Sequence, residues 1–367
     1  MADIVGHAHD ALASLMPSQL TFLQNLPKAE LHAHLNGCIP IHVLQELASE
    51  RAVSSDTSIS NEIVQKGIER LKAGVVLKEI HDFFGLFPAI YALTSNPSAL
   101  ARATRAVLAQ FLDGVPSQAA YLELRSTPRE TPDMSRLQYI QTVLDEVERY
   151  PPERAALIVS VDRRMREEVA RDCVECAVRL RKEGRRVVGV DLCGDPLAGE
   201  MSTFEQCFRL AKEAGLGVTL HIAETRENTI DDTLKLLSFS PDRLGHATFL
   251  GAAEQDFVRN TNTCVEICLT SNLLCKTVET LGDHHIRYYL KYDHPVCICV
   301  GSLPVSPSMN LIFVDGTQTD DTLPFRNSLL GEYALLMAAP PFGLGLSEAE
   351  ITRIAQMGMD SRFKSPS

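Results

Sequence analysis

Short runs of Val, Ile and Leu alternate with longer segments of helical spacing along most of this chain. The apolar runs predict eight strands, at residues 29–35, 120–126, 156–162, 187–193, 217–224, 243–246, 264–270 and 295–300. Apolar residues at helical spacing predict helices at residues 41–52, 61–72, 76–92, 97–114, 137–150, 167–181, 202–214 and 327–338, with a last one starting at Ser347. The pattern is that of an α/β protein.

Strict alternation of strands and helices favours a parallel sheet with helices outside it. Eight strands fit a closed (β/α)8 TIM barrel, with extra helices after the first strand, although an open doubly wound sheet has the same element order. The barrel is preferred because its strand ends all meet at one rim, where barrel active sites lie. Polar residues do follow strand after strand: His32, His34, Arg125–Arg129, Asp162, Asp195, His221, Glu224, His246, Ser271, Asn272, Asp320 and Asp321.

Length and composition limit the choice of domains and partners. We expect residues 1–25 to form a lead-in with a short helix and residues 26–367 to form a single barrel domain. A formal net charge of −12 argues against a nucleic-acid polymer as partner. The chain shows neither a membrane-spanning apolar run nor the order of a signal peptide. Together with ten cysteines, which we expect to be reduced thiols, this predicts a cytoplasmic protein, and we expect a monomer.

Two motifs are set aside. The pair His7 and His9 lies in a small-residue segment with no apolar alternation, so we do not expect it to bind a metal. Cys173 and Cys176 form a Cys-x-x-Cys motif, but it falls within a predicted helix and has no second pair at metal-binding spacing. We interpret both cysteines as buried helix residues, and residues 297 and 299 as core cysteines of the eighth strand.

His32 and His34 lie two residues apart on the predicted first strand, so their imidazoles point to one face. Such a pair can bind a divalent metal, although ordinary strand histidines have the same spacing. In a barrel, His221 on the fifth strand and Asp320 after the eighth would join them. Three imidazoles and a carboxylate suit one zinc ion per chain, which would lower the pKa of a bound water to about 7.

Three further residues at the rim are candidates for chemistry. Glu224 ends the fifth strand and could donate a proton to a substrate, although a lone glutamate there is more often solvated. His246 on the sixth strand could orient a metal-bound water or be a core histidine. Asp321 follows Asp320, so one carboxylate of the pair could bind metal and the other substrate; the alternative is a pair that caps the following helix.

Six segments resemble, in the same order, motifs of the adenosine/AMP deaminase family. They are Leu26-Pro-Lys-Ala-Glu-Leu-His-Ala-His-Leu-Asn-Gly37, Tyr121-Leu-Glu-Leu-Arg-Ser-Thr-Pro-Arg129, Asp191-Leu-Cys-Gly-Asp195, His221-Ile-Ala-Glu224, Asp242-Arg-Leu-Gly-His246 and Thr319-Asp-Asp321. The resemblance covers nearly the whole chain after Leu26 and is closest to the adenosine deaminase-like branch. It implies a TIM barrel of the metal-dependent hydrolase type. It also implies zinc-dependent hydrolytic deamination at C6 of a purine nucleotide, with N6-methyl-AMP converted to IMP and methylamine. Adenosine and AMP are the alternative substrates.

The resemblance also implies roles for individual residues. The implied zinc ligands are His32, His34, His221 and Asp320. Glu224 would protonate N1 of the purine while activated water attacks C6, and His246 would position that water. Further substrate contacts would come from His34, Asn36, Asp162, the Gly194 backbone and Asp321, the last at N7.

The turn after the second strand bears on the choice between nucleoside and nucleotide. Ser126, Thr127, Pro128 and Arg129 place two hydroxyls and a guanidinium at a strand end, which suits a phosphate monoester. The same residue types are common in capped turns. A nucleoside enzyme needs no cationic end, so we favour a nucleotide substrate.

The sequence departs from the family pattern before the last implied zinc ligand. In the family the eighth strand runs directly into the Asp-Asp pair, whereas residues 300–318 intervene here. One hypothesis is a translated, unremoved intron, since Val codons begin with GT and a Gln codon can end in AG. A genuine loop, or a replacement strand that offers Asp315 as ligand, is the alternative. Either detour could weaken zinc binding, so a folded but inactive chain is a further hypothesis. Another barrel metallohydrolase is a separate alternative.

Overall fold

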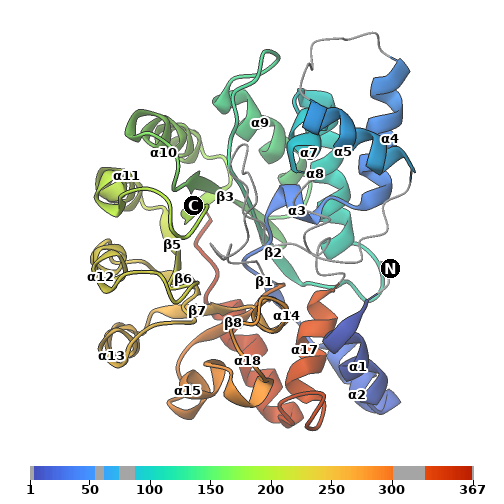
Figure 1. The fold of residues 1–367 in the computed structure, drawn as a ribbon, viewed down its shortest axis with the longest axis vertical. Coiled ribbons are helices and arrows are strands. Elements are labelled where there is room, and N and C mark those ends of the chain that lie inside the picture. The colour runs from blue at the N-terminus through green and yellow to red at the C-terminus, as the bar shows by residue number, and fades with distance from the viewer. Residues whose placement is uncertain (1–3, 54–61, 74–86, 301–326, 366–367) are drawn as a thin grey trace.

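The computed structural model describes residues 4–53, 62–73, 87–300 and 327–365. Eight parallel strands form one sheet in sequence order, β1 to β8, with helices outside it (Figure 1). The strands are β1 Ala29–Glu30, β2 Tyr121–Ser126, β3 Ala155–Asp162, β4 Val187–Cys193, β5 Gly217–Ile222, β6 Arg243–His246, β7 Cys264–Ile267 and β8 Val296–Ile298. The predicted (β/α)8 barrel is confirmed.

The ring closes where β8 meets β1. The Cys297 thiol donates to the Ala29 carbonyl at 3.8 Å. Just beyond β8, the backbone N–H of Val300 donates to Glu30 Oε2 at 2.9 Å. Because both contacts join the last strand to the first, the strand ends surround a common rim.

Helices connect consecutive strands around the outside of the barrel (Figure 1). Between β1 and β2 lie α3 Leu35–Cys38, α4 Ile41–Val53, α5 Glu62–Ala73, α7 Phe87–Leu93 and α8 Pro97–Leu112. The later ones are α9 Arg136–Val147, α10 Glu167–Lys182, α11 Glu205–Glu213, α12 Ile230–Ser238, α13 Ala252–Thr261, α14 Leu269–Leu274, α15 Ile286–Lys291, α17 Leu329–Met337 and α18 Glu348–Asp360. Helices α12, α13 and α15 were not predicted. Ser347 caps α18 through Glu350, as predicted.

Four predicted strands are too long, the fifth and eighth by a few residues, and the first and seventh for an identifiable reason. The first was expected to reach residue 35 but ends at Glu30, whose own carboxylate takes the N–H of His32 at 2.8 Å. The seventh was expected to reach residue 270 but ends at Ile267. There the Glu332 carboxylate accepts the N–H groups of Leu269 at 2.9 Å and Thr270 at 3.2 Å, which starts helix α14 instead. The rim residues Ser271 and Asn272 therefore lie on that helix.

The N-terminal segment folds onto the helical layer. It forms two helices, α1 Gly6–Ser14 and α2 Pro17–Asn25, which lie beside α17 (Figure 1). A Cβ at Gly331 of α17 would lie only 3.0 Å from the Ala8 side chain, so the glycine permits the close approach of α1. His7 and His9 are exposed on α1, away from the barrel rim.

Buried apolar residues form two clusters. The larger fills the space between strands and helices, and the smaller lies inside the barrel, where residues 264, 268, 297 and 299 are all cysteines. All ten cysteines are free thiols, Cys297 and Cys299 are core residues as predicted, and Cys173 is buried on α10 with Cys176 half-buried. Among the described helices, none is long and apolar enough to cross a bilayer.

Candidate active site

Three imidazoles converge at the rim. His32 and His34 follow β1, and His221 lies on β5. One ring nitrogen from each lies within 4.8 Å of the others, and all three side chains are buried. The ring centroid of His32 lies 4.6 Å from that of His221 and 5.7 Å from that of His34. Borderline nitrogen donors gathered this closely fit a zinc ion.

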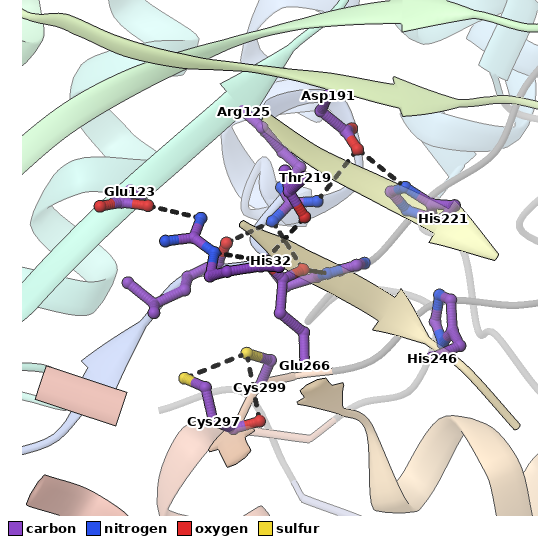
Figure 2. Close-up of polar contacts among 12 residues, drawn as sticks. His32, Glu123, Arg125, Asp191, Thr219, His221, His246, Glu266, Cys297 and Cys299 are labelled. Atoms are coloured by element: carbon purple, nitrogen blue, oxygen red, sulfur yellow. Dashed lines mark hydrogen bonds and ion pairs between the residues drawn. The ribbon is translucent and has the colours of Figure 1, made fainter. Parts of the chain in front are cut away.

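Two carboxylates behind the imidazoles hold the rings in place (Figure 2). Nδ1 of His32 bonds to the Glu266 carboxylate, and Nδ1 of His221 lies 3.0 Å from Asp191 Oδ1 and 3.0 Å from the Leu192 carbonyl. Metal-binding histidines are typically fixed through the second nitrogen in this way, which leaves the first for the metal.

Arg125 joins these two carboxylates inside the barrel. Its guanidinium lies 2.9 Å from Glu266 and 3.4 Å from Asp191. Burial disfavours ionisation of both carboxyls, but the adjacent cations outweigh it and hold the pKa of Asp191 and of Glu266 well below the usual range. Both are therefore acceptors for the imidazole N–H groups at neutral pH.

Glu224 and His246 lie next to the three histidines. Glu224 follows β5, is buried, and has its Oε2 at 3.9 Å from Nε2 of His246. Its loop is fixed by Asn228, whose side-chain oxygen accepts the Glu224 N–H at 3.0 Å. The His246 ring centroid lies 5.1 Å from that of His32. The structure thus brings both predicted catalytic side chains to the candidate metal site.

Asn36, Asp162 and Gly194 are predicted substrate contacts. Asn36 lies on α3 with its side-chain oxygen buried and without a hydrogen-bond partner among the described residues. Gly194 follows β4 with φ +105°, and a Cβ there would lie 2.7 Å from Asp162 Oδ1, so this turn needs glycine. Asp162 itself is bonded to Arg164 at 2.6 Å.

Side chains of the predicted phosphate-binding turn contact neighbouring side chains of the protein. Ser126 Oγ lies 2.8 Å from the Tyr139 hydroxyl, and Thr127 Oγ1 lies 3.7 Å from Cys193 Sγ. Pro128 is buried. Arg129 donates to Thr94 Oγ1 at 2.8 Å and lies over the Tyr91 ring at 4.1 Å.

The sequence analysis grouped Arg125 with residues 126–129 on the rim, and for Arg125 this was wrong. It points into the barrel and is ion-paired there, so it is not a rim group. Arg129 has no carboxylate partner in the described part of the chain, which leaves its charge for an anion.

Asp320 and Asp321 lie outside the described residues, as do Asp315 and all of the 300–318 segment except Val300. The predicted carboxylate ligand and the predicted N7 contact therefore stay predictions.

Besides Asp191, which lies in a quoted motif but was given no role, sequence reasoning missed three residues that support the site. Glu266 binds His32, Arg163 donates to the His221 carbonyl at 2.6 Å, and His285 Nε2 bonds to the His246 carbonyl at 2.9 Å. Glu266 was detectable, because a charge within the apolar run 264–268 needs a partner. Arg163 and His285 come from loops whose sequences give no such signal.

Comparisons with known proteins agree with this geometry. A family model described as adenosine deaminase matches residues 27–366. The human protein named N6-methyl-AMP deaminase is 34% identical over 348 residues, which cover 90% of this chain and 88% of that protein. The apo structure of the Arabidopsis thaliana N6-methyl-AMP deaminase superposes with a TM-score of 0.76 at 32% identity, covering 94% of each chain. The Arabidopsis protein named ADAL, solved in complex with IMP, gives a TM-score of 0.74 at 31% identity, again over 94% of each chain.

Proposed function

This chain belongs to the adenosine deaminase family and is a purine deaminase, and we propose that it converts N6-methyl-AMP and water to IMP and methylamine. The observation that carries the proposal is the buried group of three imidazoles with Glu224 and His246 against it. Support for the nucleotide comes from relatives at 31–34% identity, one named for N6-methyl-AMP and one solved with IMP. IMP is the product that this reaction would release.

His32, His34 and His221 would hold one zinc ion, and the Asp320 carboxylate would complete the set by its place in the family motif. When bound, zinc supplies a Lewis acid that makes hydroxide available near neutral pH. The donor set fits the ion, because each of two imidazoles is fixed through Nδ1 by a buried carboxylate.

Glu224 and His246 would move the protons. The Glu224 carboxyl would donate its proton to N1 of the purine, which makes C6 electrophilic and leaves the N1–H of IMP. His246 would orient the water and accept one of its protons, and the second proton of the water would pass through the Glu224 carboxylate to the departing methylamine. His246 would then return its proton to Glu224, whose Oε2 lies 3.9 Å from the Nε2 of His246. One water is consumed, the C6–N bond breaks, and a C6–O bond forms.

Arg129 would bind the phosphate at the far end of the substrate. Its guanidinium is fixed by Tyr91 and Thr94 and has no carboxylate partner within the described residues. A guanidinium held in one orientation suits a phosphate monoester. Asn36 and the Gly194 turn would contact the purine and ribose.

The protein would act in the cytosol, given its ten free thiols. We also expect a monomer, which size-exclusion chromatography with light scattering checks.

The activity is tested by following the absorbance of N6-methyl-AMP, AMP and adenosine with the zinc-loaded full chain and with a chain that lacks residues 300–318. We expect N6-methyl-AMP to give the highest kcat/KM. Activity only in the shortened chain would mean that the deaminase site is intact and that this segment blocks it. A zinc-replete shortened chain that leaves all three purines unchanged would refute the proposal.

A further inference from the structure

The C-terminal segment enters the end of the barrel opposite the candidate active site. After α18 it runs toward β5 (Figure 1), and Phe363 packs against Gly189 of β4 and Gly217 of β5. The Phe363 ring lies 3.7 Å from the Arg243 guanidinium, and Arg243 Nη1 donates to the Ser361 carbonyl at 2.9 Å. The Phe363 N–H donates to Glu123 Oε1 at 2.7 Å. Both the ring and the backbone of Phe363 are therefore fixed to charged residues at this end of the barrel.

Two strands leave room for this ring. A Cβ at Gly189 of β4 would lie 2.6 Å from ring carbons of Phe363, and one at Gly217 of β5 would lie 2.4 Å away. Contacts that short do not occur, so neither position accepts another residue while the ring is in place. The Phe363 ring thus occupies a space between the strands that is shaped for it, and the segment does not merely cover the barrel end.

From Glu123, which accepts the Phe363 N–H, a continuous series of buried polar contacts leads to a candidate zinc ligand. Figure 2 labels Glu123, Glu266 and His32 of this series. Glu123 Oε2 lies 2.6 Å from Arg243 Nη2, and Arg243 Nε lies 2.7 Å from Glu266 Oε1. The other oxygen of Glu266 binds Nδ1 of His32. All four side chains are at most 1% exposed.

Because the series is buried, the position of each side chain in it depends on the position of the side chain before it. In the barrel interior a displaced charge cannot be compensated by water, so Arg243 and Glu266 must keep their geometry together. Thr219 and Arg125 also bond to Glu266, at 3.0 and 2.9 Å, and hold its orientation from the sides. Phe363 and the Ser361 carbonyl hold Arg243 from the end of the barrel opposite the candidate active site.

We infer that Phe363 is a positioning residue for the metal site, acting on His32 through Arg243 and Glu266. The inference rests on the proposed zinc site. It assigns the C-terminal segment a role in metal affinity, although the segment lies at the opposite end of the barrel from the substrate.

The test compares the full chain with F363A, using F342A as the matched control because Phe342 is an exposed phenylalanine. Zinc affinity is measured by competition with a chelator, and the visible absorption of the cobalt-substituted protein reports ligand geometry. We expect F363A to lose about tenfold in zinc affinity, the lower end of the effect of residues that orient metal ligands, and to change the cobalt spectrum. F342A should match the wild type in both.

An F363A protein with wild-type zinc affinity and an unchanged cobalt spectrum would overturn the inference. If F363A does not fold, F363L decides the matter, since it fills the space without the aromatic contact to Arg243. Reduced affinity in F363L supports the inference and wild-type affinity overturns it. A wild-type protein that binds no zinc would instead count against the proposed function.

Discussion

Glu266 of β7 holds the imidazole of His32, a residue 234 positions earlier in the chain. The same carboxylate binds Arg125 at 2.9 Å and Arg243 at 2.7 Å. With two guanidinium partners it stays ionised inside the barrel, so it accepts the Nδ1–H of His32 and leaves Nε2 for a metal. This pairing explains how a buried histidine is kept in the form that binds zinc.

Replacing Glu266 tests this role. We expect E266Q to lower zinc affinity by about 10- to 100-fold, because the amide loses the charge that orients His32 and pairs with two arginines. Chelator competition measures the change. An E266Q protein with wild-type zinc affinity would mean that His32 needs no such support.

Glu224 is expected to affect the chemistry and not the metal. E224Q keeps the shape of the side chain but cannot donate a carboxyl proton, so kcat should fall by about 10²- to 10⁴-fold with zinc content unchanged. Steady-state kinetics and metal analysis check the two parts. E227Q is the control, because Glu227 is exposed on the same loop. Unchanged kcat in E224Q would remove the proposed proton donor.

Arg129 is expected to distinguish nucleotide from nucleoside. R129Q should reduce kcat/KM for N6-methyl-AMP by about 10- to 100-fold, the value of one charged hydrogen bond. N6-methyladenosine lacks the phosphate, so its kcat/KM should stay the same. Equal losses on both substrates would assign Arg129 a purely structural role through Tyr91 and Thr94.

Burial gives Glu332 an effect on stability that depends on pH. Burial raises the pKa of Glu332 to about 7, from the value of 4.5 that is usual for a glutamate. The folded chain therefore favours the neutral form of Glu332. The stabilisation of the folded state that results is complete below about pH 4.5 and is lost as the pH rises through about 7. E332Q stays neutral throughout. From about pH 5 to 8, the wild type should lose about 1–3 kcal/mol of unfolding free energy relative to E332Q.

Urea denaturation at the two pH values measures this difference. The control is E348Q, since Glu348 is exposed on α18. A constant difference between wild type and E332Q at both pH values would show that Glu332 does not titrate in this range.

The barrel and the three histidines were accessible from sequence for clear reasons. Continuous apolar strands alternate with amphipathic helices, and His32, His34 and His221 each follow or end a strand, so topology alone brings them together. The ends of two strands were not accessible. The first strand ends where the Glu30 carboxylate takes the N–H of His32, two residues on, which the apolar alternation does not indicate. The seventh ends because the Glu332 carboxylate takes backbone N–H groups through a tertiary contact that the local pattern does not encode.

Buried charges were harder to place than apolar residues. Arg125 was grouped with the polar residues of the rim, because it lies at a strand end directly before Ser126 and Thr127. Its inward direction follows from the alternation of β2 and from its partners on β4 and β7, which become neighbours only when the barrel closes. Phe363 gave no signal either, since the two glycines that accommodate it look like ordinary strand residues.

The most direct test of the account is a zinc titration of the metal-free full chain while N6-methyl-AMP deamination is followed. We predict no activity without metal and a linear rise that stops at one zinc per chain, with H221A inactive at every concentration. Deamination that persists in the metal-free protein, or at wild-type rate in H221A, would contradict the assignment of these imidazoles as the metal site of a deaminase.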